Sequence, residues 1–128
     1  MFKLNEYQAF LINLLENTDY KVCDYVPSNA DMPLIIVENM SISKGKSKVG
    51  NIFNLNQTIN IFSDYEGKKE INEITNKVID NINSSIGCII DSYSVCDINF
   101  QVVEISKQLE ESNIFYKADI IVNFTLCE

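Results

Sequence analysis

The sequence predicts an α+β fold in which two helices pack on one face of a mostly antiparallel sheet of four to five strands. In residues 4–15 and 71–82, apolar side chains recur every three or four positions, the period of an amphipathic helix. In residues 53–61 and 118–127, apolar and polar side chains alternate, as they do in half-buried strands. The expected order of elements is α-β-β-β-α-β-β.

The first helix is expected over residues 4–15, where Tyr7, Leu11 and Leu14 continue one apolar stripe and polar side chains fill the other side. Turn-forming residues at 17–19 end it. A short strand or extended arm follows over residues 20–26.

Two strands are then expected over residues 34–42 and 53–61, and together they form an antiparallel hairpin. The segment between them, residues 43–50, is rich in lysine, serine and glycine, which is typical of a solvated turn. We therefore expect a long hairpin that protrudes from the body of the protein.

The second helix is expected over residues 71–82. Ser63 or Asp64 can cap its entrance, and Gly87 can end it.

The remaining chain is predicted to close the sheet. Residues 88–97 are ambiguous between a short strand and a turn, and two strands follow over residues 99–107 and 118–127. Between these strands, residues 108–113 are polar and acidic and are expected to form a turn.

Length and composition limit the function. The 128 residues suit one domain spanning residues 1–128. With 10 lysines against 18 acidic residues, the net charge is −8, and neither arginine nor histidine occurs. This composition disfavours nucleic-acid binding, a zinc site and histidine-based catalysis. The chain has no apolar run long enough to cross a membrane and no signal-peptide pattern, so a soluble intracellular protein that is not an enzyme is expected.

The short motifs predict no catalytic, cofactor or metal site. Gly45-Lys46-Ser47 resembles the end of a phosphate-binding loop, but Met40 stands where that motif needs another glycine. The four cysteines have irregular gaps without a C-x-x-C pair, and we expect unpaired thiols that pack as small hydrophobic residues. They are Cys23, Cys88, Cys96 and Cys127.

Taken in order, these features resemble a known family, the tail terminator or tail completion proteins of tailed bacteriophages and of phage-tail-like bacteriocins (tailocins). The resemblance covers nearly the whole chain but contains no catalytic motif. Besides the first helix and the closing hairpin, it rests on Val22-x-Asp24-Tyr25-Val26-Pro27, Met32-Pro33-Leu34-Ile35-Ile36-Val37 and Gln57-x-Ile59-x-Ile61-Phe62-Ser63.

The resemblance implies a structural protein of a virion tail, assembled in the bacterial cytoplasm. Its expected form is a homo-oligomeric ring, usually a hexamer, that caps the tail tube, stops its polymerisation and offers a surface to head-closure, collar or sheath proteins. DNA would pass through the channel without specific binding, and no membrane is involved. A head–tail connector (neck) protein and a small cytoplasmic ligand-binding or regulatory module are the alternatives.

The protruding hairpin is the expected contact with neighbouring copies or partners, because an unpaired strand ladder can accept another strand and lysines can bind an acidic neighbour. The residues expected to make this contact are Lys44, Lys46, Lys48, Val49 and Ile52.

Overall fold

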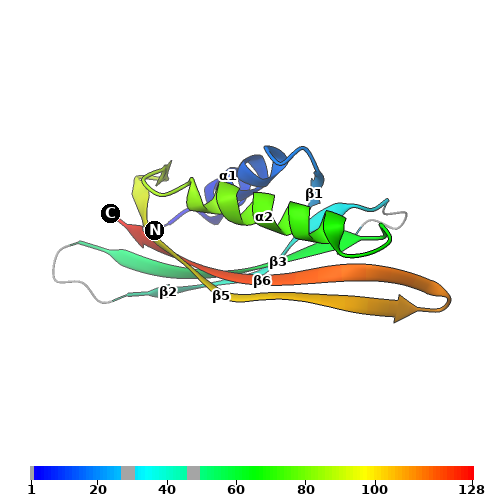
Figure 1. The fold of residues 1–128 in the computed structure, drawn as a ribbon. Coiled ribbons are helices and arrows are strands. Elements are labelled where there is room, and N and C mark those ends of the chain that lie inside the picture. The colour runs from blue at the N-terminus through cyan, green and yellow to red at the C-terminus, as the bar shows by residue number, and fades with distance from the viewer. Residues whose placement is uncertain (1, 27–30, 46–49) are drawn as a thin grey trace.

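The structure, a computed structural model, describes residues 2–26, 31–45 and 50–128. In these residues two helices lie above one sheet (Figure 1). In chain order the elements are α1 (Leu4–Glu16), β1 (Lys21–Cys23), β2 (Leu34–Lys44), β3 (Ile52–Ser63), α2 (Lys69–Asn83), β4 (Ile89–Ile90), β5 (Tyr93–Glu110) and β6 (Asn113–Cys127).

The sheet has six strands in the order β1-β2-β3-β6-β5-β4. The α+β class is confirmed, but the expected four to five strands were too few, and the sheet is mixed because β1 pairs with β2 in parallel. The additional strand is β4, which spans two residues and pairs with the start of β5. A strand this short contains too few residues to produce an alternating pattern.

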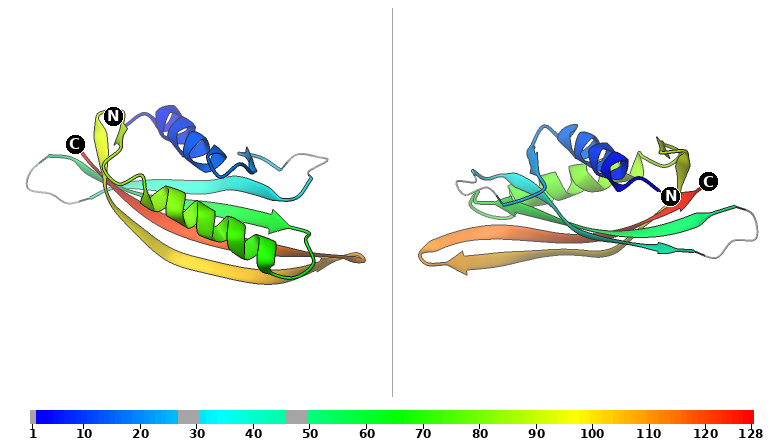
Figure 2. Two further views of the ribbon diagram at one scale, coloured as in Figure 1. Left: turned by 45° about the horizontal axis from the view of Figure 1, so that its top comes forward. Right: turned by 180° about the vertical axis from the view of Figure 1, so that it is seen from behind.

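Both helices cover the same face of the sheet (Figure 2) and bury their predicted stripes against it. α1 buries Tyr7, Leu11 and Leu15, and α2 buries an isoleucine-rich stripe between Ile71 and Ile82. Every second side chain of β3 and β6 completes this core. The two helices are themselves joined where Asn81 Nδ2 donates a hydrogen bond of 3.1 Å to Leu14 O.

Gln57 is the buried polar side chain that links α1 to the sheet. Gln57, on β3, is 1% exposed and accepts a 2.8 Å hydrogen bond from Tyr7 Oη. Its Nε2 donates to Glu38 O at 3.0 Å and to Thr58 O at 2.9 Å, beside a bulge in β2. Burial raises the pKa of Tyr7, so the phenol keeps the proton that it donates to Gln57. A satisfied polar network of this kind fixes α1 against the bulged strand.

The predicted hairpin of residues 34–61 is present as β2 and β3, but residues 46–49 of its expected tip lie outside the described residues. β3 is an interior strand and pairs with β6 along its whole length, from Ile52–Cys127 to Ser63–Tyr116. In contrast, β5 and β6 continue to pair with each other beyond the level of Ser63, as far as Glu110–Asn113. Among the described residues, β5 and β6 therefore extend beyond the end of β3 as a two-stranded hairpin, which the sequence patterns did not predict.

Candidate assembly surfaces

The described residues contain no group of three or more His, Cys, Asp or Glu side chains that could hold a metal ion. Within the same residues, no helix is long and apolar enough to span a membrane. The surface features that could bind a partner are the edges of the sheet, its uncovered face and its two ends.

In the part of the chain that the structure describes, both outer strands of the sheet have long free edges. β1 covers β2 only at Leu34–Ile36, which leaves residues 37–44 without a neighbour on that side. β4 covers β5 only at Tyr93 and Ser94, which leaves residues 96–110 free. Free strand edges present unpaired N–H and C=O groups and readily accept another strand.

The two free edges lie at the same level on opposite sides of the sheet. Val37 on β2 pairs with Ile59 on β3, and Ile59 pairs with Ile120 on β6. Ile120 also pairs with Val103 on β5, so Val37 and Val103 lie at the same level. At the other end of this stretch, Lys44 is level with Val95 through the same chain of partners. Residues 37–44 of β2 and 95–103 of β5 are therefore matched in height.

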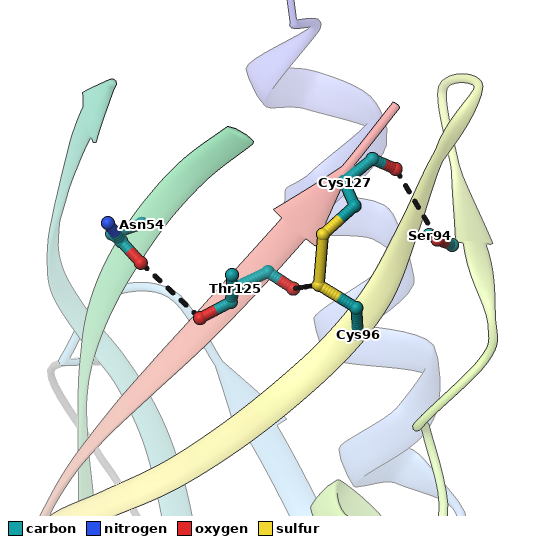
Figure 3. The surroundings of a disulfide bond; sticks show 5 residues. All are labelled: Asn54, Ser94, Cys96, Thr125 and Cys127. Atoms are coloured by element: carbon teal, nitrogen blue, oxygen red, sulfur yellow. Dashed lines mark hydrogen bonds between the residues drawn. A yellow bond between two sulfur atoms is a disulfide. The ribbon is translucent and has the colours of Figure 1, made fainter. Parts of the chain in front are cut away.

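The face of the sheet opposite the helices is mainly polar, with Leu34 and Ile36 buried at the corner beside β1 and smaller apolar pairs at Val102–Ile121 and Phe62–Phe115. Amide and hydroxyl side chains form ladders across β3 and β6: Asn123 Nδ2 donates to Asn56 Oδ1 at 2.9 Å. Thr125 Oγ1 donates to Asn54 Oδ1 on β3 at 3.3 Å (Figure 3). By strand alternation, this face carries the acidic residues Asp97, Glu104, Glu110 and Asp119 and the lysines Lys21 and Lys117.

Its charge is accordingly negative. Lys117 Nζ lies 3.3 Å from Asp119 Oδ1, so this lysine is already paired on the face itself. Asp97 and Glu104, both exposed, remain as acidic groups.

One end of the sheet is formed by residues 107–116 of β5 and β6, which we call the arm. Leu109 and Ile114 stand directly opposite each other in the arm and are 72% and 50% exposed. The acidic Glu110 and Glu111 lie beside them, and the turn itself is limited to residues 111–112. The turn expected over residues 108–113 was therefore too long. Leu109, inside that stretch, and Ile114, directly after it, were the signal that the strands continue.

The other end of the sheet holds Lys44 and Ile52, two of the five residues that the sequence predicted as contacts. Lys44 is exposed and Ile52 is half-buried, and the two strands meet where Gly45 N donates to Ile52 O at 2.7 Å. Lys46, Lys48 and Val49 lie outside the described residues. The C-terminal residue is attached nearby, since Asn51 Nδ2 donates to Glu128 Oε2 at 2.7 Å.

The expectation of four unpaired thiols is wrong for two of them. Cys96 on β5 and Cys127 on β6 form a disulfide with Cα atoms 6.2 Å apart (Figure 3). Ser94 Oγ donates to Cys127 O at 3.4 Å beside it. The pairing was missed because residues 88–97 had no assigned strand, and so no register against β6. Cys23 is half-buried and Cys88 is exposed, so neither packs as a core residue.

Comparison with known proteins gives two matches. The family described as tail completion protein gp17 matches residues 11–101, which is more than half of the chain. A chain in a solved structure titled the virion of a native gene transfer agent particle superposes with a TM-score of 0.61 at 14% sequence identity. That match covers 96% of this chain and 92% of the other, and at this identity it shows a shared fold. No curated protein matches the chain.

Proposed function

This chain belongs to the tail completion protein gp17 family and is a structural protein of a phage-type tail, and from that premise we propose that it forms a ring capping the tail tube. The ring is a hexamer, as the resemblance to tail terminators implies. It ends polymerisation of the tube and provides the surface for head-closure or collar proteins, and for the last sheath layer where the tail has one. The role is structural rather than enzymatic, and assembly takes place in the bacterial cytoplasm.

The observation that carries this proposal is the pair of free edges on opposite sides of one sheet. A contact between two different surfaces of identical chains is heterologous, and it closes into a ring when the rotation between copies is a whole fraction of a turn. In such a ring, the arm of every copy lies at one end, and the end with Lys44 and Ile52 lies at the other. Because these two ends differ in chemistry, a ring bound to the tube by one end cannot be extended by a second ring in the same way.

We assign the arm to the tail tube. A joint that must persist in a finished particle resembles a permanent interface, and permanent interfaces are more apolar than transient ones. Leu109 and Ile114 supply that apolar surface in each copy. The opposite end, with Lys44 and Ile52, then faces the head or collar side, where a lysine can bind an acidic neighbour. Lys46, Lys48 and Val49, outside the described residues, belong to the same proposed contact.

The uncovered face of the sheet is the proposed lining of the channel. Its amide and hydroxyl ladders offer no cluster of positive charge, and its free acidic groups, Asp97 and Glu104, repel phosphate. With a net charge of −8 on every chain, DNA is expected to move through the ring without being held.

Removal of the gene from its particle tests this function. We expect tail tubes of unregulated, mostly excess length that carry no head or collar, because nothing ends tube growth. Tube lengths in electron micrographs measure the effect. Tubes of normal length without heads would instead identify a head–tail connector, and normal complete particles would contradict both roles.

Complementation then examines the arm. The wild-type chain is expected to restore uniform tubes, whereas Leu109→Asp is expected to fail, because it places a charge in the apolar contact. Ile89→Asp is the matched control, since Ile89 is 67% exposed on β4, outside the arm. Equal thermal midpoints would show that both variants fold. Full restoration by Leu109→Asp would remove the arm from the tube contact.

A further inference from the structure

We propose that neighbouring copies in the ring are joined by main-chain hydrogen bonding between the free edge of β2 in one copy and the free edge of β5 in the next. The inference rests on the proposed ring and specifies how it closes. The partner is thus a second copy of this chain. The proposed register pairs Ile42 with Ile98, Met40 with Phe100, and Val37 with Val103.

Strand direction supports this pairing. Within the sheet, β2 is antiparallel to β3, β3 to β6, and β6 to β5, so β2 and β5 run in opposite directions. Rotation about an axis along the strands preserves these directions. A neighbouring β2 would therefore meet β5 in antiparallel orientation, with both helix layers on the same side of a continuous sheet.

The bulge in β2 matches one of the two bulges in β5, and the other β5 bulge, between Val95 and Asp97, lies outside the proposed pairing. β2 has one extra residue between Val37 and Met40, and β5 has one extra residue between Phe100 and Val102. Both lie at the level of Gln57, whose partner on β6 is also the partner of Phe100. A bulged edge pairs poorly with a regular strand, which protects it from indiscriminate association.

In the proposed register the extra residue of β2, between Val37 and Met40, lies opposite the extra residue of β5 in the neighbouring copy. Five residue steps separate Val37 from Ile42, and five separate Ile98 from Val103. The two irregular edges therefore fit each other without a gap in the ladder.

The main-chain groups on both edges also point outward at the paired positions. Val95 N donates to Cys88 O, and Val95 O accepts from Gly87 N, so the main-chain N–H and C=O of Val95 point away from β6. By alternation along the β5–β6 register, the main-chain N–H and C=O groups of Ile98, Phe100 and Val103 also point away from β6. On the other side, Ile52 O faces β2 because it accepts from Gly45 N. By the same alternation, the main-chain N–H and C=O groups of Ile42, Met40 and Val37 in β2 point away from β3.

Side chains beside this seam have a place to pack. A groove of about 450 Å³ lies between α1 and the free edge of β2, with Leu4, Tyr7, Val37 and Met40 in its lining. Val103, on the helix side of β5 and 46% exposed, would sit opposite Val37 at this groove. Pairing would bury both apolar edges at once.

Disulfide trapping tests the register. Ser41 and Asn99 are exposed, lie on the uncovered face, and form a directly opposed pair without hydrogen bonds in the proposed register. Such pairs have Cα atoms about 4.5 Å apart, close enough for a disulfide. Ser41→Cys with Asn99→Cys is made in a chain that also carries Cys23→Ser and Cys88→Ser, so that the Cys96–Cys127 bond is retained.

After mild oxidation, we expect a ladder of covalent oligomers up to the closed ring on a non-reducing gel, and reductant should collapse it. Ser41→Cys with Glu104→Cys is the control, since it displaces one cysteine by five residues, or about 17 Å along the strand. Because cysteines with Cα atoms more than about 7 Å apart do not bridge, we expect roughly tenfold less covalent oligomer in the control.

The outcomes separate the two proposals when light scattering gives the mass of the same samples. A ring that shows no more cross-linking in the test pair than in the control would overturn the edge pairing and leave the ring intact. A chain that stays monomeric at high concentration and forms no cross-links would overturn both.

Discussion

Truncation of Phe124 to alanine is expected to lower the free energy of unfolding by about 3–5 kcal/mol, the range for removing a fully buried aromatic side chain. Phe124 is 0% exposed and lies on β6, between β3 and β5. Its ring meets that of Tyr7 edge-on, with centroids 6.2 Å apart. The substitution therefore opens a cavity where α1 packs on the sheet, and urea denaturation with a fluorescence or circular-dichroism signal measures the loss.

Phe115→Ala is the matched control for this prediction. Phe115 is on the same strand but is half-buried on the uncovered face, near Phe62. We expect a loss of about 1 kcal/mol, because little of its contact area is enclosed. If the two substitutions cost the same, the core does not lie where the structure places it.

Reduction of the Cys96–Cys127 disulfide is expected to lower the free energy of unfolding by about 2–4 kcal/mol. The bond joins residues 31 positions apart and restrains the unfolded chain, and in the folded chain it joins β5 to the end of β6. Urea denaturation with and without reductant measures the difference.

A double variant, Cys96→Ser with Cys127→Ser, serves as the control, and its stability should match that of the reduced wild type and be insensitive to reductant. Cys88→Ser, at an exposed and unpaired cysteine, should behave like the wild type. An unchanged wild-type midpoint in reductant would show that the bond does not form in solution.

Sequence patterns predicted the elements whose burial depends on local periodicity. α1 and α2 include the predicted helical segments, and the alternation of β3 and β6 matches their burial in the structure. These patterns were readable because each element has one face against a single core and another against solvent or polar neighbours.

The features that were missed depend on register between distant strands. β5 begins at Tyr93 rather than near residue 99, and its two bulges interrupt the alternation that would have marked it. A closing hairpin was expected, but the disulfide and the arm depend on the full length and register of the β5–β6 pairing, and the free edges depend on how short β1 and β4 are, which no local pattern encodes. The lysine-rich segment, in contrast, was visible in the sequence, but its part in assembly remains a prediction.

The mass of the purified protein in solution, measured by light scattering and combined with negative-stain images, tests the central claim most directly. The account predicts closed rings of six chains, each of 14.6 kDa, with an open central channel. A protein that remains monomeric at high concentration and does not join the ends of assembled tail tubes would contradict it.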